Sequence, residues 1–406
     1  MKLKVKLKLQ APLAVTAKKA TSAHTAGLEF VPGTTWRGAL AQAYLDQLGQ
    51  PDARFRDWFT SGQLIFSDLV LGDENGPSSP IPMTAVTCKR FGGFKADERD
   101  RGQQAHGVMD ILIPEIISKL TGQGPSAPIG KTYRYCPAPG CEERLEPLAG
   151  WYLRSQAGYR QLEVEKVIRA GTAIDSYTGT VRRGVLFSSD CLQEGQFLYG
   201  SISYRSKASQ ATEPISLSQV LEDMARTLVF KGSSIHIGRA VSRGLGSCRV
   251  ETVSLEKEEL APGNTVPDRC RRFNQEIAKR ARLTEDQRLF SLTLQSRLII
   301  VDAFLRYQVG ISSSYLEKAL DLPVGSIRPV FKAVRPVGVS GWNSAWGLPK
   351  EDELALAPGS VFAYQVDLGA AQVGEDELYA RLALLEQEGI GERKAEGFGR
   401  VTVCDA

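Results

Sequence analysis

Residues 238–250 read GRAVSRGLGSCRV and residues 389–400 read GIGERKAEGFGR. Both stretches share one glycine spacing, in which a glycine, five residues, a glycine, one residue and a third glycine follow each other. The matching pairs are Gly238 and Gly391, Gly244 and Gly397, and Gly246 and Gly399, each 153 positions apart. Equal spacing in two distant stretches is typical of an internal repeat. The pattern therefore indicates a duplicated structural unit.

The same kinds of element flank both glycine-rich stretches. An amphipathic helix is predicted over residues 216–230, and another over residues 375–388, where Leu378, Leu382 and Leu385 share one face. A short strand is predicted directly after each stretch. Nucleotide-binding fingerprints need the reverse order, because phosphates bind the free N–H groups at the start of a following helix. A nucleotide-binding loop is therefore disfavoured.

Strand signals open each half of the chain. Residues 2–9 alternate lysine with leucine or valine, which predicts a strand with one buried and one positive face. A second opening strand is predicted within 288–302 and a helix within 312–323, with later strands within 331–342 and a hairpin over 356–366. A unit of strand, helix, two strands, helix and strand gives a ferredoxin-like, RRM-like fold. The predicted class is α+β with two such domains.

The length of 406 residues suits two or three domains. We expect an N-terminal domain at 1–255, a linker at 256–285 and a C-terminal domain at 286–406. Periodicity weakens between about residues 75 and 180, which are expected to form a long insertion in the first domain. The chain shows neither a long apolar run nor a signal-peptide pattern, so no membrane partner and a cytoplasmic location are expected.

The stretch FVPGTTWRGALAQAYL, residues 30–45, predicts the first helix. Pro32 and Gly33 make a turn, and Thr34 or Thr35 is the expected cap. Arg37 falls in the first turn, where a cation opposes the helix dipole. Either an anionic partner lies near Arg37, or the side chain is simply exposed to solvent.

The insertion contains a set of possible metal ligands. These are Cys88, His106, Cys136 and Cys141. Seven cysteines are an odd number and too few for a disulfide scaffold in this chain. Three thiolates and an imidazole form a closed tetrahedral zinc set, and zinc would help the insertion hold its shape. The spacing C-x4-C is looser than C-x2-C, so structural zinc and unpaired thiols both remain open.

The quoted motifs resemble those of a known family. FVPGTTWRGALAQAYL is similar to the first-helix motif of the RAMP superfamily of CRISPR-associated proteins, and both glycine-rich stretches are similar to its glycine-rich loop. With two such units and a Cys/His insertion, the chain most resembles the Csx-ten (Cas-five-like) family of type III-D effector subunits. The resemblance implies a non-catalytic subunit in antiviral defence that binds the 5′ handle of the guide RNA (crRNA) and docks neighbouring subunits.

The resemblance also implies an RNA site on the first helix and the glycine-rich stretches. Glycines let a backbone approach phosphates closely, and flanking cations attract those phosphates. Tight packing between helix and strand is the alternative for the glycines. Lysines 2, 4, 6 and 8 either extend the RNA surface or form a solvated strand face. The expected RNA-binding residues are Gly33, Arg37, Gly238, Arg239, Arg243, Gly244, Gly246, Gly391, Arg393, Lys394, Gly397, Gly399 and Arg400.

No catalytic residue is expected, but an enzyme is the runner-up. Some RAMP proteins cleave guide RNA without metal, using a histidine as general base, and His24 lies where such a base would be placed. A surface histidine is the plainer interpretation. Asp68 either takes part in metal-dependent cleavage, or it caps or ends a strand. Asp110 either takes part in the same cleavage, orients His106, or begins a helix. A protein-only interaction scaffold is a third possibility.

Overall fold

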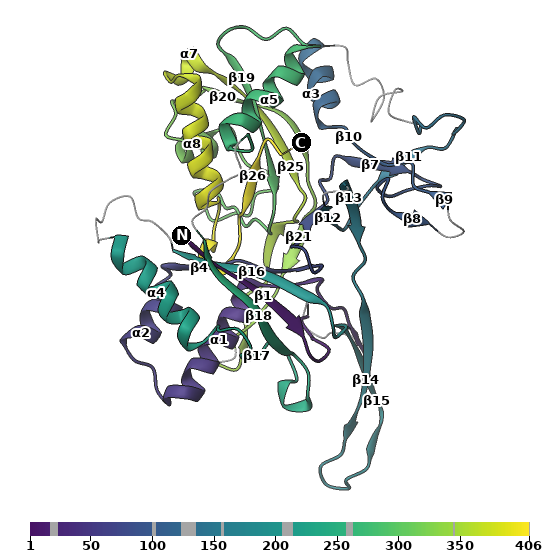
Figure 1. The fold of residues 1–406 in the computed structure, drawn as a ribbon, viewed down its shortest axis with the longest axis vertical. Coiled ribbons are helices and arrows are strands. Elements are labelled where there is room, and N and C mark those ends of the chain that lie inside the picture. Colours follow the sequence, from purple (N-terminus) through teal and green to yellow (C-terminus); the bar gives the residue numbers. More distant parts are fainter. Residues whose placement is uncertain are drawn as a thin grey trace.

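A computed structural model describes residues 1–16, 23–99, 103–122, 135–155, 158–204, 214–256, 263–343 and 346–405. They form two antiparallel sheets covered by helices, several smaller sheets and one projecting hairpin (Figure 1). The predicted α+β class is confirmed. Residues 1–256 and 263–405 are called the first and second halves below, and the predicted domain boundaries stay a prediction.

The sheet of the first half has the strand order β17-β18-β1-β16-β5-β3, and β4 also pairs with β16. Its four main strands, β18, β1, β16 and β5, lie side by side in this order. Numbered by their position in the sequence, they are the fourth, first, third and second strands. The strands are β1 (Lys2–Leu9), β3 (Phe30–Val31), β4 (Leu64–Phe66), β5 (Leu69–Gly72), β16 (Phe197–Tyr204), β17 (Ser234–His236) and β18 (Ser247–Glu256). The helices are α1 (Gly33–Leu48), α2 (Ala53–Phe55), the π-helix η1 (Arg56–Thr60) and α4 (Pro214–Thr227).

The core of the first half lies between β1 and the helices α1 and α4. The leucines and Val5 of β1 are buried, as the alternation predicts. They pack with Trp36 and Leu40 of α1 and with Leu221 of α4. The period-two pattern was sufficient to place β1, because one of its faces lines this core.

The sheet of the second half has the strand order β20-β25-β19-β26, which, read from β26, is again fourth, first, third, second. These strands are β19 (Gln287–Leu294), β20 (Ile327–Ala333), β25 (Val361–Asp367) and β26 (Val401–Val403). The helices are α5 (Val266–Ala278), α6 (Ser313–Ala319), α7 (Leu368–Ala371) and α8 (Glu375–Glu388). The hairpin predicted over 356–366 is wrong: β24 (Glu353–Leu356) pairs with β21 (Pro336–Val339), whereas β25 pairs with β19 and β20.

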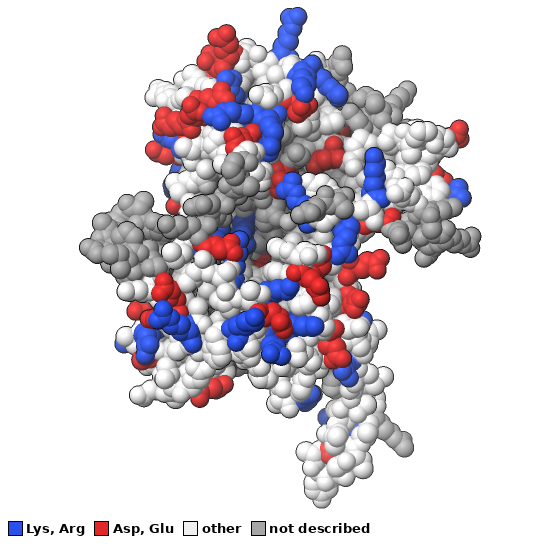
Figure 2. Space-filling view, viewed as in Figure 1, with Lys and Arg blue, Asp and Glu red and all other residues white. Residues whose placement is uncertain are grey.

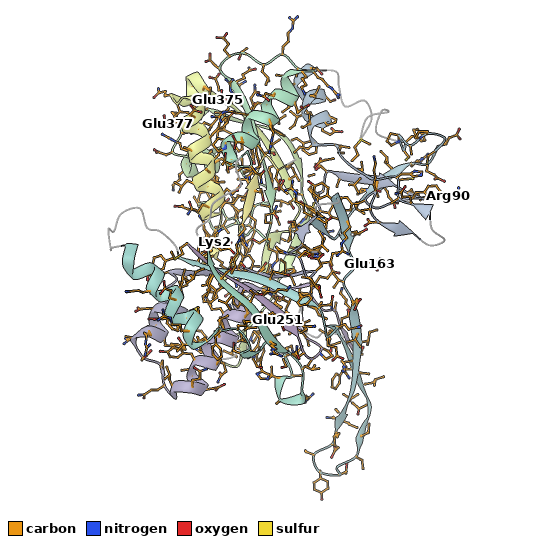
Figure 3. The ribbon with its side chains drawn as sticks, in the orientation of Figure 1. Lys2, Arg90, Glu163, Glu251, Glu375 and Glu377 are labelled. Carbon is orange, nitrogen blue, oxygen red and sulfur yellow. The ribbon has the colours of Figure 1, made fainter. Side chains whose placement is uncertain are left out.

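Helix α8 shows why the second half folds as predicted. Leu378, Leu382 and Leu385 are buried in the core. Glu375 and Glu377 lie at the start of the helix (Figure 3), where negative charge suits the helix dipole. Glu375 also accepts a hydrogen bond from the Nη2 group of Arg288 at 2.6 Å.

The segment between β5 and β16 is more regular than expected. It forms β6 (Ser79–Pro80), β7 (Ala85–Cys88), β8 (Glu98–Arg99), β9 (Gln103–Gln104), β10 (Val108–Asp110), α3 (Leu112–Thr121), β11 (Leu145–Pro147), β12 (Trp151–Ser155) and β13 (Gly158–Leu162). Its helix α3 adds Leu112 and Ile116 to the core of the second half. The inserted segment therefore packs on the second half. Its position within the first half of the sequence did not indicate this contact.

A long hairpin extends from the same segment. It consists of β14 (Lys166–Ile174) and β15 (Val181–Leu192), which also pairs in parallel with β2 (His24–Thr25). The hairpin, called the arm below, projects away from both sheets (Figure 1). It continues to Leu192 and so passes the predicted end of the insertion. Among the helices of the described ranges, none is long and apolar enough to cross a membrane.

Candidate nucleic-acid interface and metal centre

The two glycine-rich loops have the same backbone conformation. We call residues 238–246 loop 1 and residues 391–399 loop 2. The φ angles are 89°, 82° and 75° for the glycines of loop 1 and 78°, 88° and 74° for those of loop 2. Ala240 and Arg393 also match, at 57° and 56°, and each precedes a short 3-10 helix, η4 (Val241–Arg243) and η5 (Lys394–Glu396). The equal glycine spacing therefore corresponds to one loop conformation that occurs twice.

Matching hydrogen bonds close the two loops. The N–H group of Ile237 donates to the carbonyl oxygen of Gly246 at 2.8 Å. Ile390 donates to Gly399 at the same distance. A Cβ atom at Gly246 or Gly399 would lie 1.9 or 1.7 Å from the carbonyl oxygen of that isoleucine. The last glycine of each loop is therefore needed for the turn to close. This agrees with close packing, the alternative to RNA contact for these glycines.

Loop 2 packs against the first half. A Cβ atom at Gly397 would lie 2.6 Å from the carbonyl oxygen of Phe66 and 2.9 Å from the backbone nitrogen of Asp68. From the other side, a Cβ atom at Gly33 would lie 2.6 Å from the carbonyl oxygen of Glu396. Backbone thus meets backbone where loop 2 touches α1 and the turn between β4 and β5. We call this contact the seam.

Charged side chains at the seam pair with one another. Glu396 lies 3.4 Å from Arg37 and 3.6 Å from Lys350, and it accepts a hydrogen bond from Arg393. Arg393 is also paired with Glu353. Burial opposes ionisation of Glu396, but the hydrogen bond from Arg393 and the nearby cations outweigh it and lower its pKa. The anionic partner that Arg37 needs is therefore a carboxylate of the same chain.

A buried carboxylate and a buried guanidinium lie beneath these pairs. Asp68 accepts a hydrogen bond from the N–H group of Gly33 at 2.8 Å. Arg297 lies 4.9 Å from the ring of Phe30 and 4.7 Å from the ring of Phe398. Burial raises the pKa of Asp68, and the charge of Arg297 opposes this rise. Asp68 thus caps α1, a role that the sequence did not predict.

The predicted threonine cap is wrong. Thr34 and Thr35 lie inside α1, which begins at Gly33 and has Pro32 at its cap position without a side-chain cap. The carboxylate that satisfies the first N–H group comes from Asp68. Because this acceptor is distant in sequence, the local capping pattern gave no sign of it.

Loop 1 faces solvent where loop 2 is covered. In the described part of the chain, no atom beyond its two neighbouring residues lies within 4 Å of the position that a Cβ of Gly244 would take. Arg239 and Arg243 are exposed, and in the aligned loops they stand where loop 2 has Glu392 and Glu396. The two loops therefore share a backbone, but loop 1 carries two arginines and no acid, whereas the four charges of loop 2 sum to zero.

The lysine face of β1 is engaged within the chain. Lys4 pairs with Glu256. Lys6 donates to the carbonyl oxygen of Glu74 at 2.8 Å, and its ammonium lies 4.2 Å from the ring centre of Phe197. Lys8 lies 5.3 Å from the same ring centre. These contacts hold Lys4, Lys6 and Lys8 against the sheet. The three lysines therefore do not form the freely solvated strand face that was one of the two interpretations.

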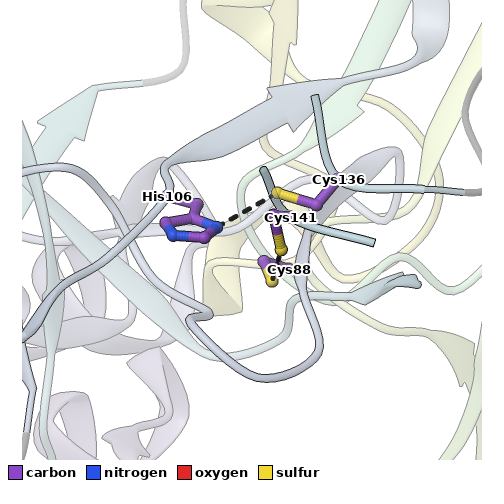
Figure 4. Close-up of side chains that lie close together, drawn as sticks. All are labelled: Cys88, His106, Cys136 and Cys141. Atoms are coloured by element: carbon purple, nitrogen blue, oxygen red, sulfur yellow. Dashed lines mark hydrogen bonds between the residues drawn. The ribbon is translucent and has the colours of Figure 1, made fainter. Parts of the chain in front are cut away.

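The four predicted metal ligands come together (Figure 4). Their donor atoms all lie within 4.8 Å of one another, with His106 Nδ1 3.2 Å from Cys136 Sγ and Cys88 Sγ 3.8 Å from Cys141 Sγ. Cys88 ends β7, His106 precedes β10, and the turn of residues 136–141 supplies the other two thiols. This Cys3His cluster can hold a metal ion.

The surroundings of the cluster fit a bound cation. The N–H group of Phe91 points at Cys88 Sγ at 3.4 Å, a contact that suits a thiolate. The ring of Phe91 covers His106, with 4.5 Å between ring centres. Burial and the adjacent thiols raise the pKa of Cys136 to about 11. A divalent cation would supply the positive charge that favours the deprotonated thiolates.

His24, the runner-up catalytic residue, is held by two side chains of the arm. Its Nδ1 atom lies 2.9 Å from Ser188 Oγ and its Nε2 atom 3.4 Å from Asp190 Oδ1. The parallel pairing of β2 with β15 creates this arrangement.

Asp110 accepts a hydrogen bond from the N–H group of Leu112 at 2.8 Å, which confirms that it begins a helix.

Several residues of these sites were missed from sequence. Ser188 and Asp190 gave no signal, because an isolated serine and aspartate on a strand form no motif. At the seam, Arg297 contacts the ring of Phe30 and Lys350 contacts Thr34 across the two halves, and Glu353 pairs with Arg393, which is distant in sequence. A usable signal was the lack of acidic residues in loop 1, since the aligned loop 2 has two of them.

Comparisons with known proteins give distant likenesses. No protein-family model and no curated protein matches the chain. A solved chain of the Type III-B Cmr-beta complex bound to cognate target RNA and AMPPnP is 13% identical, with a TM-score of 0.41 and 89% of this chain and 86% of that chain covered. A chain of the same complex with cognate target RNA is also 13% identical, with a TM-score of 0.39 and the same coverage of both chains. Cas6 in a product complex is 15% identical, with a TM-score of 0.31, and the match covers 52% of this chain and 78% of Cas6. With TM-scores below 0.5, none of the proposals below rests on these likenesses.

Proposed function

We propose that the chain is a non-catalytic, RAMP-like RNA-binding subunit of a type III CRISPR ribonucleoprotein, and that loop 1 contacts the 5′ handle of the guide RNA. One observation carries the proposal. Loop 1 repeats the backbone of a loop built for close contact, yet it is open and has arginines where its twin has glutamates. The net charge of +2 on loop 1 therefore suits an anionic partner.

The chemistry of loop 1 favours phosphate as that partner. Gly244 leaves space on the outer side of the loop, so a sugar–phosphate backbone approaches without meeting a Cβ atom. Arg239 and Arg243 flank this space and supply charged donors for phosphate oxygens. In loop 2, the corresponding glutamate is occupied by Arg37 and Lys350. The RNA contact is therefore assigned to loop 1, while loop 2 holds the two halves together.

We further propose that the two halves are ferredoxin-like domains that arose by duplication. Their main strands share one order, and their last helix and last strand are joined by loops of equal geometry. The packing of α3 on the second half links the inserted segment to both domains.

Docking to a neighbouring subunit is proposed for the arm. Tyr177 at its turn is 97% exposed, and Ile174, Val181 and Leu186 are also exposed. The outer part of the arm is largely uncharged (Figure 2). A two-stranded hairpin with this much exposed apolar surface has no core of its own, and such surfaces mark protein contacts.

The metal of the Cys3His cluster is proposed to be structural zinc. Four protein ligands of the thiolate and imidazole type leave no open coordination position, which is typical of zinc sites that stabilise a fold. The cluster joins β7 to the turn of residues 136–141, and β7 lies four elements before α3. Zinc would thus fix the segment that carries α3 to the second half.

Binding of repeat-derived RNA tests the main proposal. Purified full-length chain is titrated into labelled repeat RNA and into a scrambled RNA of equal length and composition. Tighter binding of the repeat RNA is expected. Equal, weak binding of both would leave only a general basic surface and would contradict recognition of the handle.

An endoribonuclease remains the second candidate, because His24 is oriented by Ser188 and Asp190. An imidazole held in this way can accept the proton of a 2′-hydroxyl group without metal. Incubating repeat RNA with the wild-type chain and a chelator tests the idea. Cleavage that disappears in His24→Ala would support it, and intact RNA with the wild-type chain would rule it out.

A further inference from the structure

Two thiols face each other in the core of the second half. The Sγ atom of Cys270 in α5 lies 3.5 Å from the Sγ atom of Cys404, the residue directly after β26. Cys270 is fully buried and Cys404 is 5% exposed. Both belong to the core of the second half and lie outside the Cys3His cluster. Cys191 and Cys248 instead contact backbone oxygen atoms.

The backbone holds Cys404 in an unusual conformation next to α5. Its φ angle of 49° is left-handed, which residues other than glycine rarely adopt. Its N–H group donates to the carbonyl oxygen of Ser291 in β19 at 3.0 Å. This conformation follows the last residue of β26, Val403, and leaves the thiol of Cys404 against Cys270.

An ion pair fixes the two cysteine positions relative to each other. Arg269, which precedes Cys270, donates from Nε to the carbonyl oxygen of Val403 at 2.9 Å and pairs with Glu386 of α8. Glu386 also accepts a hydrogen bond from the N–H group of Val403 at 2.6 Å. A disulfide bond needs about 2.0 Å between its sulfur atoms, so the two thiols must approach by only about 1.5 Å.

The hydrogen bond between the thiols gives each of them a different role. Cys270 donates its S–H group to the sulfur of Cys404. This hydrogen bond, together with burial, raises the pKa of Cys270, so Cys270 keeps its proton. Cys404 is less buried, and the chain continues from it into the exposed Asp405. A small oxidant from solvent therefore reaches Cys404 first.

We propose that Cys270 and Cys404 form a modification site, at which hydrogen peroxide converts the two thiols into a disulfide bond. The Cys404 sulfur gives its proton to water and attacks one peroxide oxygen. The O–O bond breaks, and the departing hydroxide takes up a proton and becomes water. The Cys270 sulfur then attacks the sulfenic sulfur of Cys404, the S–O bond breaks, and hydroxide leaves with the Cys270 proton as a second water. The two thiols lose two electrons, and the peroxide gains them.

The disulfide would fasten β26 to α5. Its two ends are 134 positions apart in the sequence, so it would close a long loop in the unfolded chain. Such a closure lowers the entropy of the unfolded chain and thereby stabilises the folded one. Because loop 1 lies in the other half, this modification is separate from the proposed RNA contact.

Peptide mapping of the full-length chain tests the site. The folded protein is treated with hydrogen peroxide, its remaining thiols are alkylated in denaturant, and the chain is digested with trypsin. Cleavage after Arg269, Arg271 and Arg400 should release the dipeptide Cys270–Arg271 linked to residues 401–406. Dithiothreitol should separate the two peptides. The temperature of thermal unfolding should rise by several degrees on oxidation and return on reduction.

Matched variants separate this site from general oxidation. Cys270→Ala and Cys404→Ala should each lose the linked peptide and the rise in unfolding temperature, whereas Cys191→Ala should keep both. Complete alkylation of Cys270 and Cys404 in the treated wild type would overturn the proposal. Conversion of Cys404 to sulfinic acid without the linked peptide, or a linked peptide that forms only in chain unfolded by urea, would also overturn it.

Discussion

Gly244 and Gly397 adopt φ angles of 82° and 88°, but only Gly397 is covered by another part of the chain. A Cβ atom at Gly397 would lie 2.6 Å from the carbonyl oxygen of Phe66, and none of the described atoms lies within 4 Å of the same point at Gly244. One loop conformation therefore serves two contacts. Loop 2 joins the halves, and loop 1 remains available to a partner.

This relationship predicts unequal effects of one substitution. Gly244→Ala should lower the free energy of unfolding by about 1–2 kcal/mol, because a side chain is strained at positive φ. Gly397→Ala should cost about 1–3 kcal/mol more, since its Cβ atom also meets the backbone of the first half. Urea unfolding of the two variants measures the difference, and equal losses would show that loop 2 does not hold the seam.

Glu396 should make the seam sensitive to acid. Its pKa is lowered in the folded chain despite burial, mainly by the hydrogen bond from Arg393. The stabilisation is therefore fully present above the usual glutamate pKa and is lost as the pH falls through the lower, folded value. Glu396→Gln should lower the free energy of unfolding by about 3 kcal/mol at pH 7, because buried cations lose their partner.

Glu388→Gln is the matched control for that change. Glu388 is exposed at the end of α8, so its neutralisation should shift the free energy of unfolding by less than about 0.5 kcal/mol. The difference between the two variants should shrink as the pH falls below the usual glutamate pKa and through the lower, folded pKa of Glu396. A difference that persists there would show that the loss comes from packing and not from charge.

The Cys3His cluster should bind about one zinc ion per chain. Elemental analysis of purified protein should show its loss in Cys136→Ser, together with a lower temperature of thermal unfolding. Cys191→Ala is the control, because this buried cysteine lies in β15 outside the cluster. Equal metal content in Cys136→Ser and the control would contradict the assignment.

Packing of α3 on the second half gives a test of the inserted segment. Ile116→Ala should lower the free energy of unfolding by about 2–5 kcal/mol, because Ile116 is fully buried in the core of that half. Ile168→Ala, on the exposed face of the arm, should have little effect. Hydrogen exchange should show the loss of protection in β20 and α5, and a loss confined to the first half would contradict this packing.

The sequence was informative where one face of an element is buried and where spacing repeats. The alternation of β1, the leucine stripe of α8 and the paired glycines each led to a correct local structure. The four metal ligands were found by residue type. Contacts between distant residues were not predictable: Asp68 caps α1, Glu396 pairs with Arg37, and α3 crosses to the second half. No local pattern contains such contacts, because tertiary packing selects the partners.

The central claim, that loop 1 binds RNA phosphates, is tested most directly by the salt dependence of binding. The full-length wild type, Arg239→Glu/Arg243→Glu and the charge-matched control Arg280→Glu/Arg282→Glu are titrated with repeat RNA over a range of salt concentrations. The control residues are exposed just after α5, which Figure 1 shows in the upper part of the molecule, away from β17 in the lower sheet. Loss of two phosphate contacts should make the slope of log K against log salt shallower by about 1.4 in the loop 1 variant only. Equal slopes and affinities in the two variants would contradict the account.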